Sequence, residues 1–155
     1  MPRFEPDPSK VSATIEIFDK DDYEFVFGDP KAFYSKNAQT DKETYGIRFP
    51  LTIAEGTRKG GRTILTLYQH NDGSASMAKQ VVMAVLGYKN SPADEKRFDG
   101  ETAGQDWSFD TDTGACGEMW RKMSGKRAIC SLDIGTNPNS GEPSQTFKKW
   151  RPIGM

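Results

Sequence analysis

The feature that most constrains the fold is a nine-residue run, 45–53, in which apolar side chains fall at every second position. The apolar positions are Tyr45, Ile47, Phe49, Leu51 and Ile53, and the positions between them hold Gly46, Arg48, Pro50 and Thr52. A period of two places successive side chains on opposite faces, so this run predicts a β-strand with one face in a core. Pro50 cannot donate to a neighbouring strand, which indicates an edge position or a bulge.

Other short runs of the same kind predict an all-β architecture with one helix. The expected strands are 14–18 continuing through a bend into 23–27, then 45–53, 62–70, 126–134 and 145–151. Between the third and fourth of them, Ala78, Val81, Val82 and Val85 recur at helical spacing, and Gly87 follows where a C′ glycine belongs. Five strands with a helix between strands 3 and 4 predict an OB-fold barrel, in class all-β or β-rich α+β.

The length and composition predict one domain. The chain has 155 residues, of which 15 are Gly and 9 are Pro, a balance that favours short strands and loops over a helical bundle. We expect a flexible Pro-rich N-terminal arm at 1–12 and one domain at 13–155, with a long polar loop near 89–117. The apolar runs are too short for a membrane span. With no apolar leader and with two isolated cysteines, Cys116 and Cys130, we expect free thiols and a cytoplasmic location.

Charge is unevenly distributed along the chain. Residues 1–115 carry 14 basic and 19 acidic side chains, whereas residues 116–155 carry 7 basic and 3 acidic ones. The formal net charge of −1 argues against coating nucleic acid by bulk charge alone, but the asymmetry suggests a local basic surface on an acidic body.

Aromatic and basic residues alternate at 33–36, 45–48, 120–122 and 147–151. Unpaired bases stack on exposed rings set among cations, so these segments are candidates for binding single strands. If Phe147 points inward, Lys148 and Trp150 share the outer face, which places a ring beside a cation. We expect Tyr34 and Trp150 to stack on bases, although Trp150 capping a barrel end is an equal alternative. The cations expected to meet phosphates are Lys36, Arg48, Lys59, Arg62, Lys126, Arg127 and Lys148; for the loop 58–62, a solvated hairpin tip is the alternative.

Several of these segments together resemble the OB-fold single-stranded DNA-binding proteins that phages encode near replication and recombination genes. The likeness is carried by YGIRFPL at 45–51, RTILTL at 62–67, VLG at 85–87, GKRA at 125–128 and the ending WRP at 150–152. The resemblance covers roughly 23–152, and the order of the short motifs carries it. It implies sequence-tolerant binding of single-stranded DNA in a groove across the barrel. The chain departs from the pattern in lacking an acidic tail and in its long insertion at 89–117.

No catalytic or metal-binding pattern is evident in the sequence. His70 is the only histidine and lies at no recognisable catalytic motif, and the acidic pairs lie within loops. We therefore expect a non-enzyme without a cofactor or metal, whose partner is single-stranded DNA together with replication or recombination proteins. The oligomeric state is open, and a homodimer is one option. The alternatives are a protein–protein interaction module of a virion or replisome and a small metal-dependent nuclease.

Overall fold

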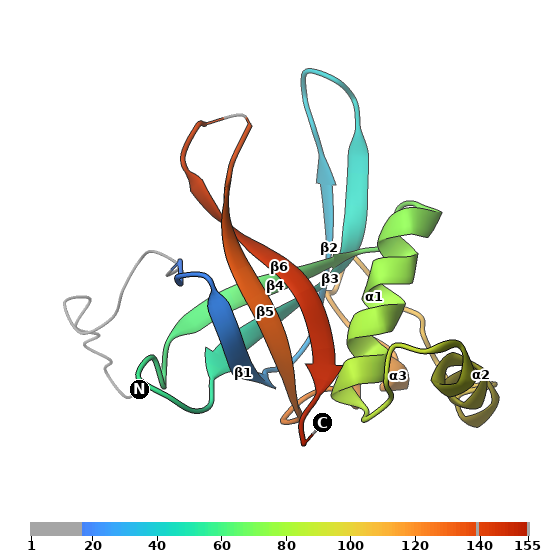
Figure 1. Cartoon of the computed structure of the whole chain (residues 1–155). Helices are drawn as coiled ribbons and strands as arrows, with labels where there is room; N and C mark the ends of the chain where they lie inside the picture. The colour runs from blue at the N-terminus through green and yellow to red at the C-terminus, as the bar shows by residue number, and fades with distance from the viewer. Residues whose placement is uncertain (1–16, 139, 155) are drawn as a thin grey trace, which may run out of the picture.

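A computed structural model describes residues 17–138 and 140–154 (Figure 1). The expected arm at 1–12 and the first part of the expected run 14–18 lie outside these residues. The described chain forms one antiparallel, curled half-barrel sheet with few helices. Its elements are β1 (Asp21–Phe27), β2 (Lys31–Lys36), β3 (Glu43–Ile53), β4 (Arg62–Tyr68), α1 (Asp72–Val85), α2 (Pro92–Glu101), α3 (Glu118–Arg121), β5 (Arg127–Thr136) and β6 (Pro143–Pro152).

Strand β3 is the centre of the sheet. Its alternation is confirmed, because Ile47, Phe49, Leu51 and Ile53 are buried while Arg48, Pro50 and Thr52 are exposed. Strand β4 pairs antiparallel with one edge of β3, so the expected strands 45–53 and 62–70 form a hairpin around the loop 54–61. The other edge is shared: β2 pairs with its first half and β1 with its last residues. Strand β1 then pairs with β5, and β5 with β6.

Helix α1 completes the core by packing against β4, β5 and β6. Strands β4 and β6 are not hydrogen-bonded to each other, so a helix rather than a strand pair covers this side of the half-barrel. The helix starts where Asn71 accepts a hydrogen bond from the Ser74 amide at 2.8 Å. It ends at Gly87, which has a φ of 94°, and the Tyr88 amide donates to the Met83 carbonyl at 2.8 Å. This glycine-based end is the one expected from the sequence.

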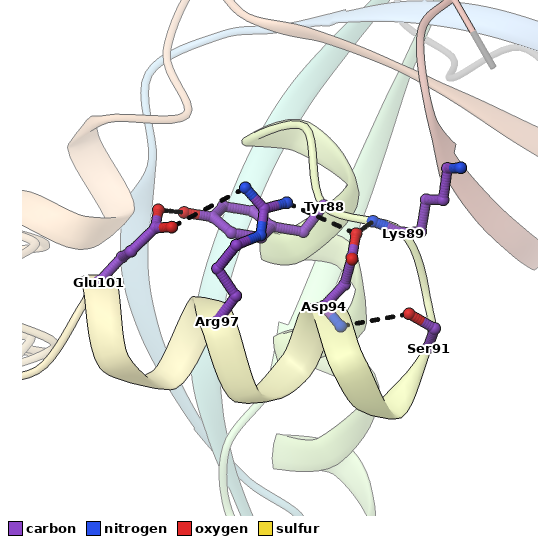
Figure 2. A network of polar contacts seen from close by, with 6 residues as sticks. All are labelled: Tyr88, Lys89, Ser91, Asp94, Arg97 and Glu101. Atoms are coloured by element: carbon purple, nitrogen blue, oxygen red, sulfur yellow. Dashed lines mark hydrogen bonds and ion pairs between the residues drawn. The ribbon is translucent and has the colours of Figure 1, made fainter.

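The prediction of one long polar loop near 89–117 is wrong, because helix α2 forms within it. Ser91 caps the helix by accepting from the Asp94 amide at 3.2 Å, and Pro92 opens its first turn. Phe98, the one fully buried residue of α2, packs edge-on against Tyr88. Polar contacts hold the exposed side (Figure 2): Arg97 lies over the Tyr88 ring and between the carboxylates of Asp94 and Glu101.

A further strand, β2, forms around Phe33 and Tyr34, where no strand was predicted from the sequence. It follows a bend at 28–30 and pairs with β3 over its whole length, from Lys31 opposite Arg48 to Lys36 opposite Glu43. The segment has only six residues, so its alternation of buried and exposed side chains is a weak signal, and the preceding Pro30 suggested a loop instead.

Two hairpins, β2–β3 and β5–β6, project from the same end of the half-barrel (Figure 1). Their turns, 37–42 and 137–142, have the same hydrogen bonds. The amide of the first residue donates to the carbonyl of the sixth, and the amide of the fifth donates to the carbonyl of the first. The fifth residue is left-handed in both, with φ of 57° at Asp41 and 72° at Gly141. The geometry of these turns therefore fixes the register of the β2–β3 and β5–β6 hairpins.

Candidate nucleic-acid interface

The outward-facing side of β2, β3 and β4 forms a continuous surface, which we call the outer platform. Strand register aligns its residues in rows, such as Phe33–Gly46–Tyr68 and Lys31–Arg48–Thr66, because directly paired residues of adjacent strands share a face. The next rows are Pro50–Ile64 and Thr52–Arg62. The outer platform comprises Lys31, Phe33, Gly46, Arg48, Pro50, Thr52, Arg62, Ile64, Thr66 and Tyr68.

Aromatic rings occupy one end of the outer platform. The rings of Phe33 and Tyr68 meet edge to face across Gly46, with centroids 5.7 Å apart. Tyr68 is 40% exposed, whereas Phe33 is buried beneath Arg48, whose guanidinium carbon lies 4.2 Å from the ring centroid. Gly46 is required here, since a Cβ would lie 2.1 Å from the Leu67 carbonyl oxygen. His70 packs behind Tyr68 at 5.5 Å between centroids, and its buried Nδ1 has no hydrogen-bond partner among the residues that the structure describes.

The cations of the outer platform have no acidic partner in the described part of the chain. Within 17–138 and 140–154, Lys31, Arg48 and Arg62 form no ion pair, and neither does Lys59 in the adjacent loop. Acidic residues are also missing from the outward positions of β2, β3 and β4. A partly apolar surface that carries exposed positive groups can accept both a base and its phosphate.

The outward side of β1, β5 and β6 differs because its arginines are paired with acids. Arg127 lies 3.0 Å from Glu24 and 3.5 Å from Glu55, and Arg151 lies 3.0 Å from Asp22. A hydrogen bond from Ser131, together with Arg151, holds the pKa of Asp22 below its usual range, so this carboxylate stays charged. The two halves of the outer surface therefore offer different electrostatics to an anion.

Tyr34 lies on the opposite face of β2 from the outer platform. It is paired with Tyr45, on the side of β2 that faces inward, and is 49% exposed where the arm projects beyond the core. Its hydrogen bond to Glu43 raises the pKa of the phenol. Lys36, at the end of the same strand, is 3.9 Å from Asp41. Tyr34 and Lys36 therefore do not lie on the outer platform with Arg48 and Arg62, although both belong to the projecting β2–β3 hairpin beside it.

The expectation that Lys148 and Trp150 share an outer face is wrong. The pairing of β5 and β6 shifts between Ser131 and Leu132, so that Lys149 pairs with Ser131 and Phe147 with Leu132. Lys148 is the extra residue of this bulge, which resets the alternation. Phe147 and Trp150 consequently both point inward and stack with centroids 5.9 Å apart. Trp150 also contacts Phe25 and Phe27, so the structure supports its role in the core.

The other predicted cations are also separated from the outer platform. Lys126 precedes β5 and lines a hollow at the C-terminal end of α1. Lys148 lines a hollow with Lys20, Asp21 and Asp22. Of the nine predicted residues, only Arg48 and Arg62 lie on the outer platform, with Lys59 next to it. Tyr68 and Lys31 were not predicted, and Tyr34 was selected in place of Phe33 within the candidate segment 33–36. The period-two pattern of β4 and of a β2 strand could have placed Phe33, Tyr68 and Lys31 beside Arg48.

No three histidine, cysteine, aspartate or glutamate side chains cluster as a metal site in the described part of the chain. In the same part, every helix is too short or too polar to cross a membrane. Comparison with known protein families and with curated proteins found no match to this chain.

Proposed function

We propose that this chain is a non-catalytic OB-fold protein that binds single-stranded DNA, with little sequence preference, on the outer platform. The resemblance of its 45–51, 62–67, 85–87, 125–128 and 150–152 segments to phage single-stranded DNA-binding proteins suggests the setting, phage DNA replication or recombination. The platform residues supply the binding chemistry.

The strand pairing is compatible with an OB barrel despite its sixth strand. Strands β1 and β2 lie in succession along the same edge of β3, with only 28–30 between them. Together they take the place of one long first strand that bends, and the count then becomes five. Counted in this way, α1 lies between the third and fourth strands together with α2 and α3, and a helix in this connection supports the proposed OB arrangement, which has one there.

The observation that carries the proposal is the grouping of Phe33, Arg48 and Tyr68 beside Lys31 and Arg62. Neither of these two cations forms an ion pair with another described residue. OB folds bind oligonucleotides on the face of their second and third strands, between the loops that join strands 1 to 2 and 4 to 5. In this chain the corresponding strands are β3 and β4, and the corresponding loops are the two projecting hairpins. The platform residues contact a base through its π-face and a phosphate through its charge, neither of which reads sequence.

Fluorescence anisotropy of labelled oligo-dT, titrated with the protein at several salt concentrations, tests the proposal. We expect binding at low salt, and log affinity falling with log salt by about 0.7 for each phosphate contact. A duplex of the same length serves as the control and should bind more weakly. Failure to bind at low salt, or equal affinity for the duplex, contradicts the proposal. Gel analysis of the same oligonucleotide after incubation with Mg²⁺ or Mn²⁺ tests the nuclease alternative, for which cleavage is the expected result.

A further inference from the structure

Beyond the outer platform, on β5, lies an arginine whose charge is paired with acidic side chains. Register places Arg62, Thr52, Val26 and Arg127 in one row across β4, β3, β1 and β5. Since neighbouring strands lie roughly 4.8 Å apart, three spacings put the backbone of Arg127 about 14 Å from the backbone of Arg62 along this row. A nucleic acid on the outer platform therefore passes close to Arg127 if it extends toward β5.

Two carboxylates face the Arg127 guanidinium from different elements. Glu24 reaches it from β1 at 3.0 Å, and Glu55 reaches it from the loop after β3 at 3.5 Å. The three side chains together carry one net negative charge. Exposed ion pairs of this kind add little to folding stability, so their main physical effect is on the local field. A phosphate at this position meets repulsion from two carboxylates, whereas Arg62 forms no ion pair with any carboxylate of the described residues.

We infer that Glu24 and Glu55 keep Arg127 from binding phosphate and thereby set the edge of the DNA site between β3 and β5. This inference rests on the proposed function, because it concerns the extent of the same site. It limits the site to the β2–β3–β4 half of the face. Six residue steps along β4 span about 20 Å. A platform of this size fits the lower end of the roughly 4–16 nucleotides that an OB fold covers.

The test compares the salt dependence of oligo-dT binding for the wild-type chain and the double variant E24Q/E55Q. Freeing Arg127 adds one phosphate contact. The slope of log affinity against log salt should therefore become steeper by about 0.7, which corresponds to about fivefold tighter binding near 0.1 M salt. Adding Arg127→Ala to the double variant should remove the gain. Arg127→Ala in the wild-type background should leave the slope unchanged.

A matched control separates the local effect from net charge. The variant E95Q/E118Q removes the same charge from two exposed helix positions and should not change the slope. The inference is overturned if E24Q/E55Q has the wild-type slope of log affinity against log salt, or if E95Q/E118Q steepens this slope as much as E24Q/E55Q does. It is also overturned if Arg127→Ala alone makes the slope less steep than in the wild-type chain. Absence of binding by the wild-type chain refutes instead the proposed function, so the two failures are distinguishable.

Discussion

Replacing Arg48 with Ala should weaken DNA binding with little loss of stability. The side chain is exposed, lies over the Phe33 ring and forms no ion pair with any described residue. Losing one phosphate contact lowers the salt slope by about 0.7, which near 0.1 M salt is about fivefold, or roughly 1 kcal/mol. The lost cation–π contact costs folding only about 0.5–1 kcal/mol at an exposed site.

Two further variants make this prediction specific. Arg48→Lys keeps the charge but loses the flat guanidinium, so the slope should stay at the wild-type value while affinity falls. Arg151→Ala removes an equally basic residue that is paired with Asp22 on the other half of the surface, and its slope should not change. Anisotropy at several salt concentrations measures the slope, and urea unfolding measures stability. An unchanged slope for Arg48→Ala, or an equal loss for Arg151→Ala, would refute the assignment of DNA to the outer platform.

Four other predictions concern the platform, the hairpin and the core. Tyr68→Ala removes an exposed stacking ring and should weaken oligo-dT binding by about 1–3 kcal/mol in the same anisotropy assay; unchanged affinity would exclude Tyr68 from the site. Asp41→Gly relieves a left-handed residue with a φ of 57° and should raise the free energy of unfolding by about 0.5–1 kcal/mol in urea, whereas Asp41→Ala should not. Trp150→Ala removes a ring from the cluster with Phe25 and Phe27 and should cost about 3 kcal/mol of stability, but Trp150→Phe should retain DNA affinity; loss of affinity in a folded Trp150→Phe variant would restore its predicted stacking role. Burial raises the pKa of the Cys130 thiol to about 12 from a usual value near 9, so the folded state holds this proton more tightly than the unfolded state, and the free energy of unfolding should fall as pH rises from 9 toward 12. Cys130→Ala should make this fall with pH less steep in urea unfolding. An equally steep fall in the variant would contradict the assignment of the effect to the buried thiol.

Regular alternation made the centre of the fold predictable. In β3 an apolar residue stands at every second position without interruption, so the buried face and the outward position of Arg48 could be read directly. Helix α1 was equally clear, because its apolar stripe ends at a glycine that the chain needs at positive φ. The sequence also contained the signals that mark the start of α2, namely Ser91 as N-cap and Pro92 in the first turn. They were outweighed by the low hydrophobicity of a helix that buries only Phe98.

The candidate site was harder to predict because it depends on register between distant segments. The bulge at Lys148 inserts one residue, and local alternation cannot reveal an insertion that only the partner strand defines. For that reason Trp150 was assigned to the wrong face. Likewise, Arg127 forms ion pairs with Glu24 and Glu55, whereas Arg48 forms none with the described residues. The sequence around the two arginines does not reveal this difference.

The central claim is that DNA lies on the outward side of β2, β3 and β4, and NMR shift mapping tests it most directly. Titrating the isotope-labelled chain with a short oligo-dT should move the backbone amide signals around Phe33, Arg48, Arg62 and Tyr68. Signals of α2 and of the Arg151–Asp22 region should stay in place. Shifts concentrated on α2, or on the outward side of β5 and β6, would contradict the account.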